Sequence, residues 1–187
     1  MKFAEFSLDT SILKAVAEER FHTATLVQQK AIPLVLAKEN VIVSAQTGTG
    51  KTAAFALPII QLLSEKASEE KSVKKIKSVI ITPTRELAIQ ILEKFTNYSK
   101  YTNLATTAVF GGVSLAPQKE LLAKGIDILI ATPGRLIDLQ LQGNIDLSGI
   151  EIFVLDEADL MLDMGFINDV KKIEALCPKK KQTLLFS

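Results

Sequence analysis

Three acidic residues, Asp156, Glu157 and Asp159, directly follow the apolar segment Ile152–Leu155. A short apolar run of this kind predicts a strand that is buried on both faces of a sheet. In an open parallel sheet, ligands bind at the carboxyl ends of the strands. Carboxylates placed there can hold Mg²⁺ and position a water, which is the chemistry of nucleotide hydrolysis. Acidic residues are also favoured in the first turn of a helix, so this segment alone leaves both interpretations open.

A glycine-rich segment upstream favours the metal interpretation. Its residues are Ala45, Gln46, Thr47, Gly48, Thr49, Gly50, Lys51 and Thr52. The segment follows an apolar run and precedes a helical pattern, which is the context that a phosphate-binding loop requires. Glycines let backbone N–H groups converge on phosphate oxygens, and the amino-terminal end of the following helix attracts the same anion. The strict pattern begins with Gly where this chain has Ala, and a chance Gly-Lys-Thr turn is the alternative.

Individual roles follow for the side chains of these two motifs. Lys51 would reach the β and γ phosphates of a nucleotide, and the hydroxyl of Thr52 would ligate Mg²⁺. Asp156 is placed to be the second Mg²⁺ ligand, and Glu157 to position or deprotonate the attacking water. We therefore interpret Lys51, Asp156 and Glu157 as catalytic, with ATP and Mg²⁺ as the implied ligands.

The elements that must position these residues alternate along the chain. Apolar runs predict strands at 41–44, 79–82, 106–110, 128–131, 152–155 and 183–186. Helical patterns occupy 11–19, 28–37, 52–63, 86–100, 118–122, 135–141 and 170–176. The polar segment 65–77 is expected to be a solvated loop or a frayed helix end. This alternation predicts an α/β fold in which helices cover both faces of a mostly parallel sheet.

Composition limits the possibilities further. The chain has 187 residues, of which 48% are hydrophobic, and this predicts one domain with a sizeable core. A formal net charge of +1 does not indicate a nucleic-acid partner, so any such site must be local. The single cysteine, Cys177, excludes an intrachain disulfide. Without a signal-like start or a membrane-length apolar run, we expect a soluble, cytoplasmic protein.

Taken together, the phosphate loop and the Asp-Glu-Ala-Asp tetrad at 156–159 resemble motifs I and II of the DEAD-box ATP-dependent RNA helicases. Further matches follow in the family's order. Pro83–Ala88 resembles motif Ia, Gly111-Gly112 the family's paired glycines, Ala131–Arg135 motif Ib, and Gln182–Ser187 the approach to motif III. The segment Met161–Phe166 is most similar to the bacterial RhlE-type branch.

The resemblance implies a RecA-like P-loop domain and an RNA helicase activity coupled to ATP hydrolysis. The positions that match the family's RNA contacts are Pro83, Thr84, Arg85, Gly111, Gly112, Thr132, Pro133, Gly134 and Arg135. Such contacts go to the RNA backbone and are independent of sequence. In the family, the last Asp of the tetrad, here Asp159, hydrogen-bonds to motif III, of which Ser187 is the first residue. We expect residues 1–187 to be one monomeric, amino-terminal RecA-like domain and a fragment that lacks the second helicase domain.

The family's Q motif, expected over about 3–28, is matched less well. Gln28 occupies the position that recognises adenine, and Thr25 matches the Thr of the motif. Phe3 matches the upstream aromatic that stacks on adenine in the family, with a disordered terminus or a core position as the alternatives. The family's Gly and Pro residues are replaced here by Arg20, Ala24 and Leu26.

Two other classes of protein compete with this interpretation. One is a P-loop phosphotransferase or a DNA translocase, against which the tetrad together with Gln28 favours the RNA helicase. The other is a non-catalytic interaction domain that keeps an inactive nucleotide fold. The presence of Lys51, Thr52, Asp156 and Glu157 argues against an inactive site.

Overall fold

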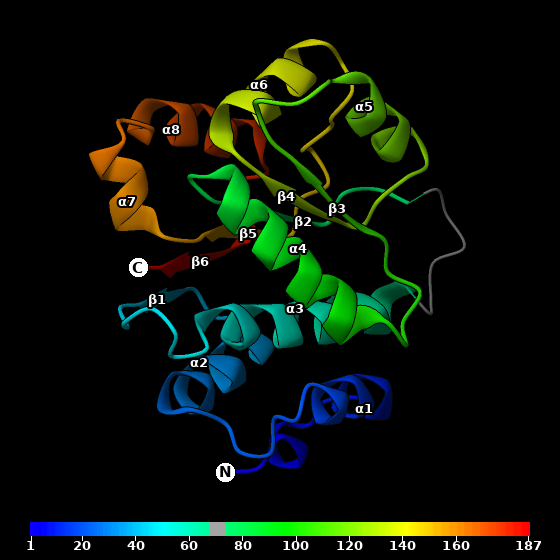
Figure 1. Cartoon of the computed structure of the whole chain (residues 1–187), viewed down its shortest axis with the longest axis vertical. Helices are drawn as coiled ribbons and strands as arrows, with labels where there is room; N and C mark the ends of the chain where they lie inside the picture. Colours follow the sequence, from blue (N-terminus) through cyan, green and yellow to red (C-terminus); the bar gives the residue numbers. More distant parts are fainter. Residues whose placement is uncertain (68–73) are drawn as a thin grey trace.

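Six short strands form one parallel sheet in the order β1-β6-β5-β2-β4-β3 (Figure 1). This computed structural model describes residues 1–67 and 74–187. The strands are β1 (Val41–Val43), β2 (Ser78–Ile81), β3 (Thr106–Val109), β4 (Ile128–Ala131), β5 (Ile152–Leu155) and β6 (Gln182–Phe186). Parallel neighbours need crossover connections, which explains why the chain alternates strands with helices. The expected α/β architecture is confirmed.

Helices lie on both faces of this sheet. They are η1 (Phe3–Phe6), α1 (Thr10–Glu18), α2 (Leu26–Leu36), α3 (Lys51–Ala67), α4 (Arg85–Ser99), α5 (Ala116–Ala123), α6 (Pro133–Leu141), α7 (Ala158–Asp163) and α8 (Ile167–Leu176). Figure 1 shows α2 and α3 below the sheet and α6 and α8 above it. Among the described residues, no helix is both long and apolar enough to cross a membrane.

Each face of the sheet carries its own hydrophobic core. Ile80, Ile130 and Val154 point toward the core shared with α1 to α4, whereas Val79 and Ile81 point toward the core shared with α6 to α8. Successive strand residues alternate between faces, and both faces are covered. This is why the central strands are continuous apolar runs instead of alternating polar and apolar residues.

The predicted elements agree with the structure at most positions. All six strands are present, and Ile128–Ala131 and Ile152–Leu155 have the predicted bounds. Two short helices, η1 and α7, were not predicted, because four and six residues are too few to show helical periodicity. Within the predicted polar segment 65–77, α3 continues to Ala67, and residues 68–73 lie outside the described part of the chain.

The loop that follows α1 contains a strained residue. Arg20 has a φ of 59°, in the left-handed region that favours glycine. Its N–H bonds to the carbonyl of Ala17, and the N–H of Phe21 bonds to the carbonyl of Val16, which together form the hydrogen-bond pattern of a Schellman helix end. The position where the DEAD-box pattern has Gly is therefore a helix terminus, and the non-glycine residue here adopts the same conformation.

Replacing Arg20 tests this strain. The Arg20→Gly variant should raise the free energy of unfolding by up to ~1 kcal/mol, since glycine removes the left-handed penalty but gains freedom in the unfolded chain. The Arg20→Val variant should lower the free energy of unfolding by more than ~1 kcal/mol, because a β-branched side chain tolerates this conformation poorly. Urea unfolding measures both values. Equal stability of the Val variant and the unmodified chain would contradict the assigned geometry.

Candidate nucleotide and RNA sites

The strand order divides the carboxyl edge of the sheet into two halves. Strands β1, β6 and β5 are followed by the glycine-rich segment 45–52, by Ser187 and by the acidic tetrad. Strands β2, β4 and β3 are followed by the three segments predicted to contact RNA, at 83–85, 132–135 and 111–112. All strands are parallel, so these loops emerge at the same edge of the sheet. The residues predicted to bind nucleotide and those predicted to contact RNA are thus side by side, with their boundary between β5 and β2.

The glycines of the phosphate loop are required by backbone geometry. Gly48 and Gly50 have φ values of +81° and +88°. A Cβ atom at Gly50 would lie 2.4 Å from Nε2 of Gln28, so no larger residue fits there without displacing that side chain. The N–H of Ala45 bonds to the carbonyl of Ser187 at 3.0 Å, which fixes the start of the loop to the end of β6.

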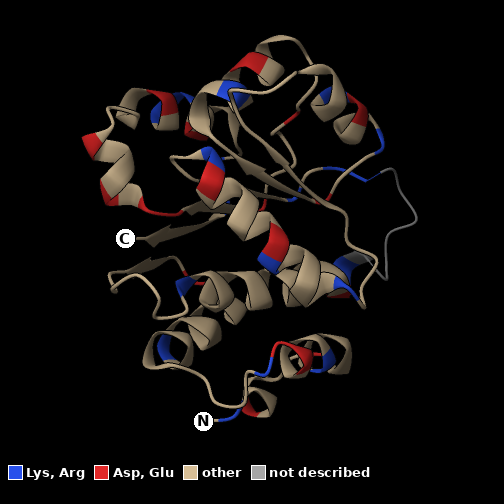
Figure 2. Cartoon of the chain, viewed as in Figure 1, with Lys and Arg blue, Asp and Glu red and all other residues tan. Residues whose placement is uncertain are grey.

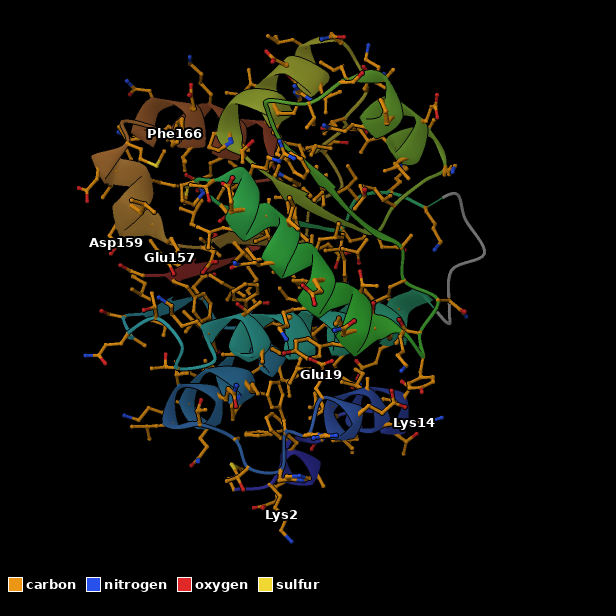
Figure 3. The ribbon with its side chains drawn as sticks, in the orientation of Figure 1. Lys2, Lys14, Glu19, Glu157, Asp159 and Phe166 are labelled. Carbon is orange, nitrogen blue, oxygen red and sulfur yellow. The ribbon has the colours of Figure 1, made fainter. Side chains whose placement is uncertain are left out.

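Lys51 and Glu157 form an ion pair at the centre of the site. Their charged atoms are 3.1 Å apart, and their side chains are only 8% and 18% exposed. Lys51 is the first residue of α3. Glu157, labelled in Figure 3, is the residue that precedes α7. Glu157 has φ 53° and ψ 51°, a left-handed conformation that is costly for a non-glycine residue. The structure therefore brings two of the predicted catalytic residues into contact across strands β1, β6 and β5.

Asp156 is the buried member of the tetrad, at 4% exposure. Burial, and then the negative charge of Glu157, raise its pKa to about 7, although Lys51 acts in the opposite direction. Asp156 and Thr52 line one hollow of about 360 Å³ together with Lys51 and Glu157. A carboxylate and a hydroxyl are the hard oxygen donors that Mg²⁺ prefers, and Mg²⁺ commonly completes its shell with water and phosphate oxygens. The predicted pair Thr52 and Asp156 thus fits a Mg²⁺ site.

The acidic segment is only in part the acidic helix start that the alternative predicts. Figure 2 shows acidic residues running from the end of β5 into α7, close to the end of β6. Asp159 lies in the first turn of α7, as expected for an acidic helix start. Asp156 does not belong to that helix, and its N–H instead bonds to the carbonyl of Ile81 at the end of β2. The tetrad is therefore a strand end followed by a helix start.

Asp159 lies under the electrostatic influence of Ser187, the residue that the family pattern pairs with it. The N–H of Leu160 and then the Ser187 hydroxyl hold the pKa of Asp159 below its usual value. The backbone of Ser187 is itself fixed, because its N–H bonds to the carbonyl of Val43 at 2.9 Å and its carbonyl accepts the Ala45 N–H. The end of β6 therefore links the tetrad to the phosphate loop.

Gln28 contacts the phosphate loop directly. Its Nε2 donates to the carbonyl of Gly50 at 3.2 Å, and its Oε1 accepts the N–H of Thr25 at 2.9 Å. The Thr25 hydroxyl accepts the Gln28 N–H in return, which completes a capping box at the start of α2. Gln28 is 4% exposed, so recognition of adenine by its amide would exchange these internal bonds for bonds to the base.

The expectation that Phe3 stacks on adenine is not supported by its position. Phe3 is 4% exposed, belongs to the core on the α1–α4 face, and lies 6.0 Å from the ring of Phe6. A ring buried in this way has no free face for a base, so the alternative, a core position, is correct. Two aromatic residues that the sequence did not indicate, Phe21 and Tyr98, line the hollow beside Gln28, with ring centroids 6.5 Å apart.

In the RNA half, the segment at the end of β2 presents polar groups beside a helix start. Thr84 caps α4 by accepting the N–H of Leu87 at 3.3 Å, and Pro83 before it is buried. Arg85 is exposed, and its guanidinium lies 5.5 Å from the ring centroid of Phe110. Gly111 and Gly112 are exposed next to that ring, with no atom near enough to contact an added Cβ. Arg85, Gly111 and Gly112 are thus exposed and Thr84 is half-buried, and the RNA contacts predicted for them stay predictions.

The segment at the end of β4 divides into an open part and an inward-facing residue. Thr132 precedes α6 without a side-chain capping bond, Pro133 is buried, and Gly134 is exposed with open space around it. Arg135 instead donates through Nη2 to the carbonyl of Val113 at 3.0 Å, while its Nε and Nη1 are buried. In this structure the guanidinium supports a neighbouring loop through one of its nitrogens, and the RNA contact predicted for Arg135 stays a prediction.

Neutralising Asp156 should stabilise the chain. The Asp156→Asn variant keeps the side-chain oxygen but removes a carboxylate that burial disfavours, so we expect the free energy of unfolding to rise by at least ~1 kcal/mol, or roughly 2–4 °C in Tm. The carboxyl titrates near 3.8 in the unfolded chain and near 7 in the folded chain. The advantage of the variant should therefore grow as the pH rises between these values and level off above 7.

A matched control lies in the same tetrad. Asp159 is exposed and its pKa is lowered, so the Asp159→Asn variant should give no gain in Tm. Thermal unfolding at pH 5 and pH 8 separates the two variants. An Asp156→Asn chain that melts below the unmodified chain at both pH values would refute the burial argument.

Comparison with known proteins agrees with this geometry. The chain is 43% identical to a probable ATP-dependent RNA helicase of Methanocaldococcus jannaschii, an alignment that covers 100% of the chain and 49% of the relative. It is 44% identical to the ATP-dependent RNA helicase CshA of Listeria monocytogenes, covering 100% of the chain and 35% of CshA. The crystal structure of a DEAD box protein from the hyperthermophile Methanococcus jannaschii superposes with a TM-score of 0.89, at 42% identity, over 100% of this chain and 50% of that one.

The chain thus spans about half the length of the relatives it matches, or less. The DEAD/DEAH box helicase family matches residues 25–187, which include the phosphate loop, the tetrad and all the predicted RNA segments. On the strength of this match and of the relatives, the chain belongs to the DEAD/DEAH box helicase family.

Proposed function

We propose that this chain is the ATP-binding half of an ATP-dependent RNA helicase. The observation that carries the proposal is the placement of a phosphate loop with its acidic partners beside three open loops on one sheet edge. The relatives named above are RNA helicases, which supports the same activity for the longer protein.

We infer that nucleotide binding exchanges the partner of Lys51. The ammonium group now pairs with Glu157, and a triphosphate would offer it a stronger, doubly charged acceptor. Glu157 would then be free to orient a water toward the γ phosphate. Thr52 and Asp156 would hold Mg²⁺, which supplies charge neutralisation on the phosphates when bound. Gln28 would contribute recognition of the base.

RNA would be bound through its backbone in the neighbouring half. Exposed glycines at 111, 112 and 134 offer backbone N–H groups, and Arg85 offers a cation. Backbone N–H groups and a cation suit phosphate oxygens, so binding would be independent of sequence. A local site of this kind is compatible with a net charge of only +1. It would need only a few groups to contact phosphates.

Finer assignments belong to the same proposal. The segment Met161–Phe166 favours the RhlE-type branch, although relatives named RhlB, CshA and RhpA are all 43–45% identical to the chain. A second RecA-like domain would complete the site from the other side, consistent with the length of the relatives. We also propose a cytoplasmic, monomeric chain.

The first test is nucleotide binding by the 187-residue chain. The Lys51→Ala variant should weaken binding of a fluorescent ADP by about 100-fold, because a buried cation that contacts phosphate is lost. The Lys66→Ala variant is a matched control, since Lys66 pairs with Glu151 at the amino end of β5, opposite the end that leads into the acidic tetrad. Unchanged affinity in the Lys51 variant would refute the phosphate-loop assignment.

The second test is catalytic and uses the longer protein. The Glu157→Gln variant should keep ATP affinity while its RNA-stimulated turnover falls by at least ~100-fold, the contribution typical of a positioned general base. Stimulation is compared between single-stranded RNA and DNA of the same sequence. Stimulation by DNA alone would show a DNA translocase, and wild-type turnover in the Gln variant would remove Glu157 from the mechanism.

A further inference from the structure

The loop between β3 and α5 leaves its central N–H groups open. We call residues 110–114 the glycine loop. Within the described part of the chain, no hydrogen bond occupies the backbone N–H of Gly111 or of Gly112. Both residues are exposed, and Gly112 has a φ of +78°. The centre of the glycine loop can therefore accept an anion without displacing any protein group.

The ends of the glycine loop are held by a side chain that the sequence did not indicate. Gln118, on α5, is 6% exposed. Its Oε1 accepts the N–H of Phe110 at 3.2 Å, and its Nε2 donates to the carbonyl of Phe110 at 3.1 Å and to that of Ser114 at 3.4 Å. The amide thus pairs with Phe110 as a neighbouring strand would, and it also closes the loop at Ser114.

A second side chain holds the glycine loop from another helix. Arg135, on α6, donates to the carbonyl of Val113 at 3.0 Å. Arg85 lies over the ring of Phe110 from the segment after β2. Side-chain contacts therefore hold residues 110, 113 and 114, and none of these contacts involves Gly111 or Gly112. This pattern is the one expected if the glycine N–H groups are reserved for a ligand.

We propose that Gln118 is a positioning residue for RNA, acting by presetting the glycine loop so that its open N–H groups meet a phosphate. The inference rests on the proposed RNA-binding function. Two consecutive glycines have more backbone freedom than any other pair, so an unsupported loop would have to be ordered when RNA binds. A loop already ordered by Gln118 avoids that loss, which is the general benefit of preorganisation.

A purely structural role for Gln118 makes a different claim. In that case the amide only satisfies buried carbonyls and anchors α5, and its loss would change stability without changing RNA affinity in the folded chain. The two roles are therefore separated by measuring RNA affinity and nucleotide affinity in the same folded variant.

The test uses the Gln118→Met variant, which keeps the side-chain length and removes the three hydrogen bonds. Amide signals of Gly111 and Gly112 in the ¹⁵N-labelled 187-residue chain are followed by NMR while oligouridylate is added. We expect these signals to shift in the unmodified chain, and the Kd from them to rise about 10-fold in the variant. Affinity for fluorescent ADP should stay within twofold. The Gln140→Met variant, on the far end of α6, is the matched control.

Each other outcome of these titrations supports or overturns the positioning role of Gln118. If Gln118→Met does not fold, the neutral Gln118→Asn variant is used; it keeps an amide but is one methylene shorter, so it cannot reach Phe110 and Ser114 together, and a rise in Kd is again expected. Shifts at the glycines with an unchanged Kd would overturn the positioning role and leave RNA binding standing. Absence of any shift at the glycines would overturn the positioning role together with RNA binding at this loop, while nucleotide binding is tested separately through Lys51.

Discussion

The parallel register of the sheet is the constraint on which both sites depend. Leu155 is in register with Ile81, and the ladder continues beyond the strands because the Asp156 N–H bonds to the Ile81 carbonyl at 2.9 Å. Asp156 is thus held by the strand that leads into the segment 83–85. A shift of one residue in this register would turn the buried carboxylate toward the opposite face of the sheet. The position of the acid proposed to bind Mg²⁺ and the position of a segment proposed to contact RNA are therefore set by the same pair of strands.

Within that frame, the polar side chains of the nucleotide site satisfy one another. Glu157 neutralises Lys51, and Gln28 bonds to the loop carbonyl of Gly50. Burying a charged group or an amide costs free energy unless it has a hydrogen-bond or ion-pair partner. In the absence of a ligand, the groups of such a site therefore pair with one another. The free energy of nucleotide binding will be the difference between the new bonds to the nucleotide and the internal bonds that they replace. Tight binding does not follow simply from the presence of Lys51.

The sequence predicts the regular part of this structure well and the contacts between loops poorly. Continuous apolar runs identify β4 and β5 because both faces of the sheet are buried, and the spacing of Gly48, Gly50 and Lys51 identifies the phosphate loop. The buried position of Phe3 could not be predicted, because an aromatic ring suits a core and a stacking site equally. Gln118 and the inward turn of Arg135 depend on contacts across three elements, for which a single sequence carries no periodic signal.

The boundary between β5 and β2 has a consequence for communication between the two sites. A close-packed parallel sheet deforms little, so the strands themselves cannot carry a large rearrangement from one site to the other. Any mutual influence has to pass through the loops that leave the neighbouring strands β5 and β2. The coupling is reciprocal: the factor by which RNA raises the affinity for nucleotide is also the factor by which nucleotide raises the affinity for RNA. If the loops did not move, each ligand would change the affinity for the other by a factor close to one. A larger factor would indicate that the loops rearrange when a ligand binds.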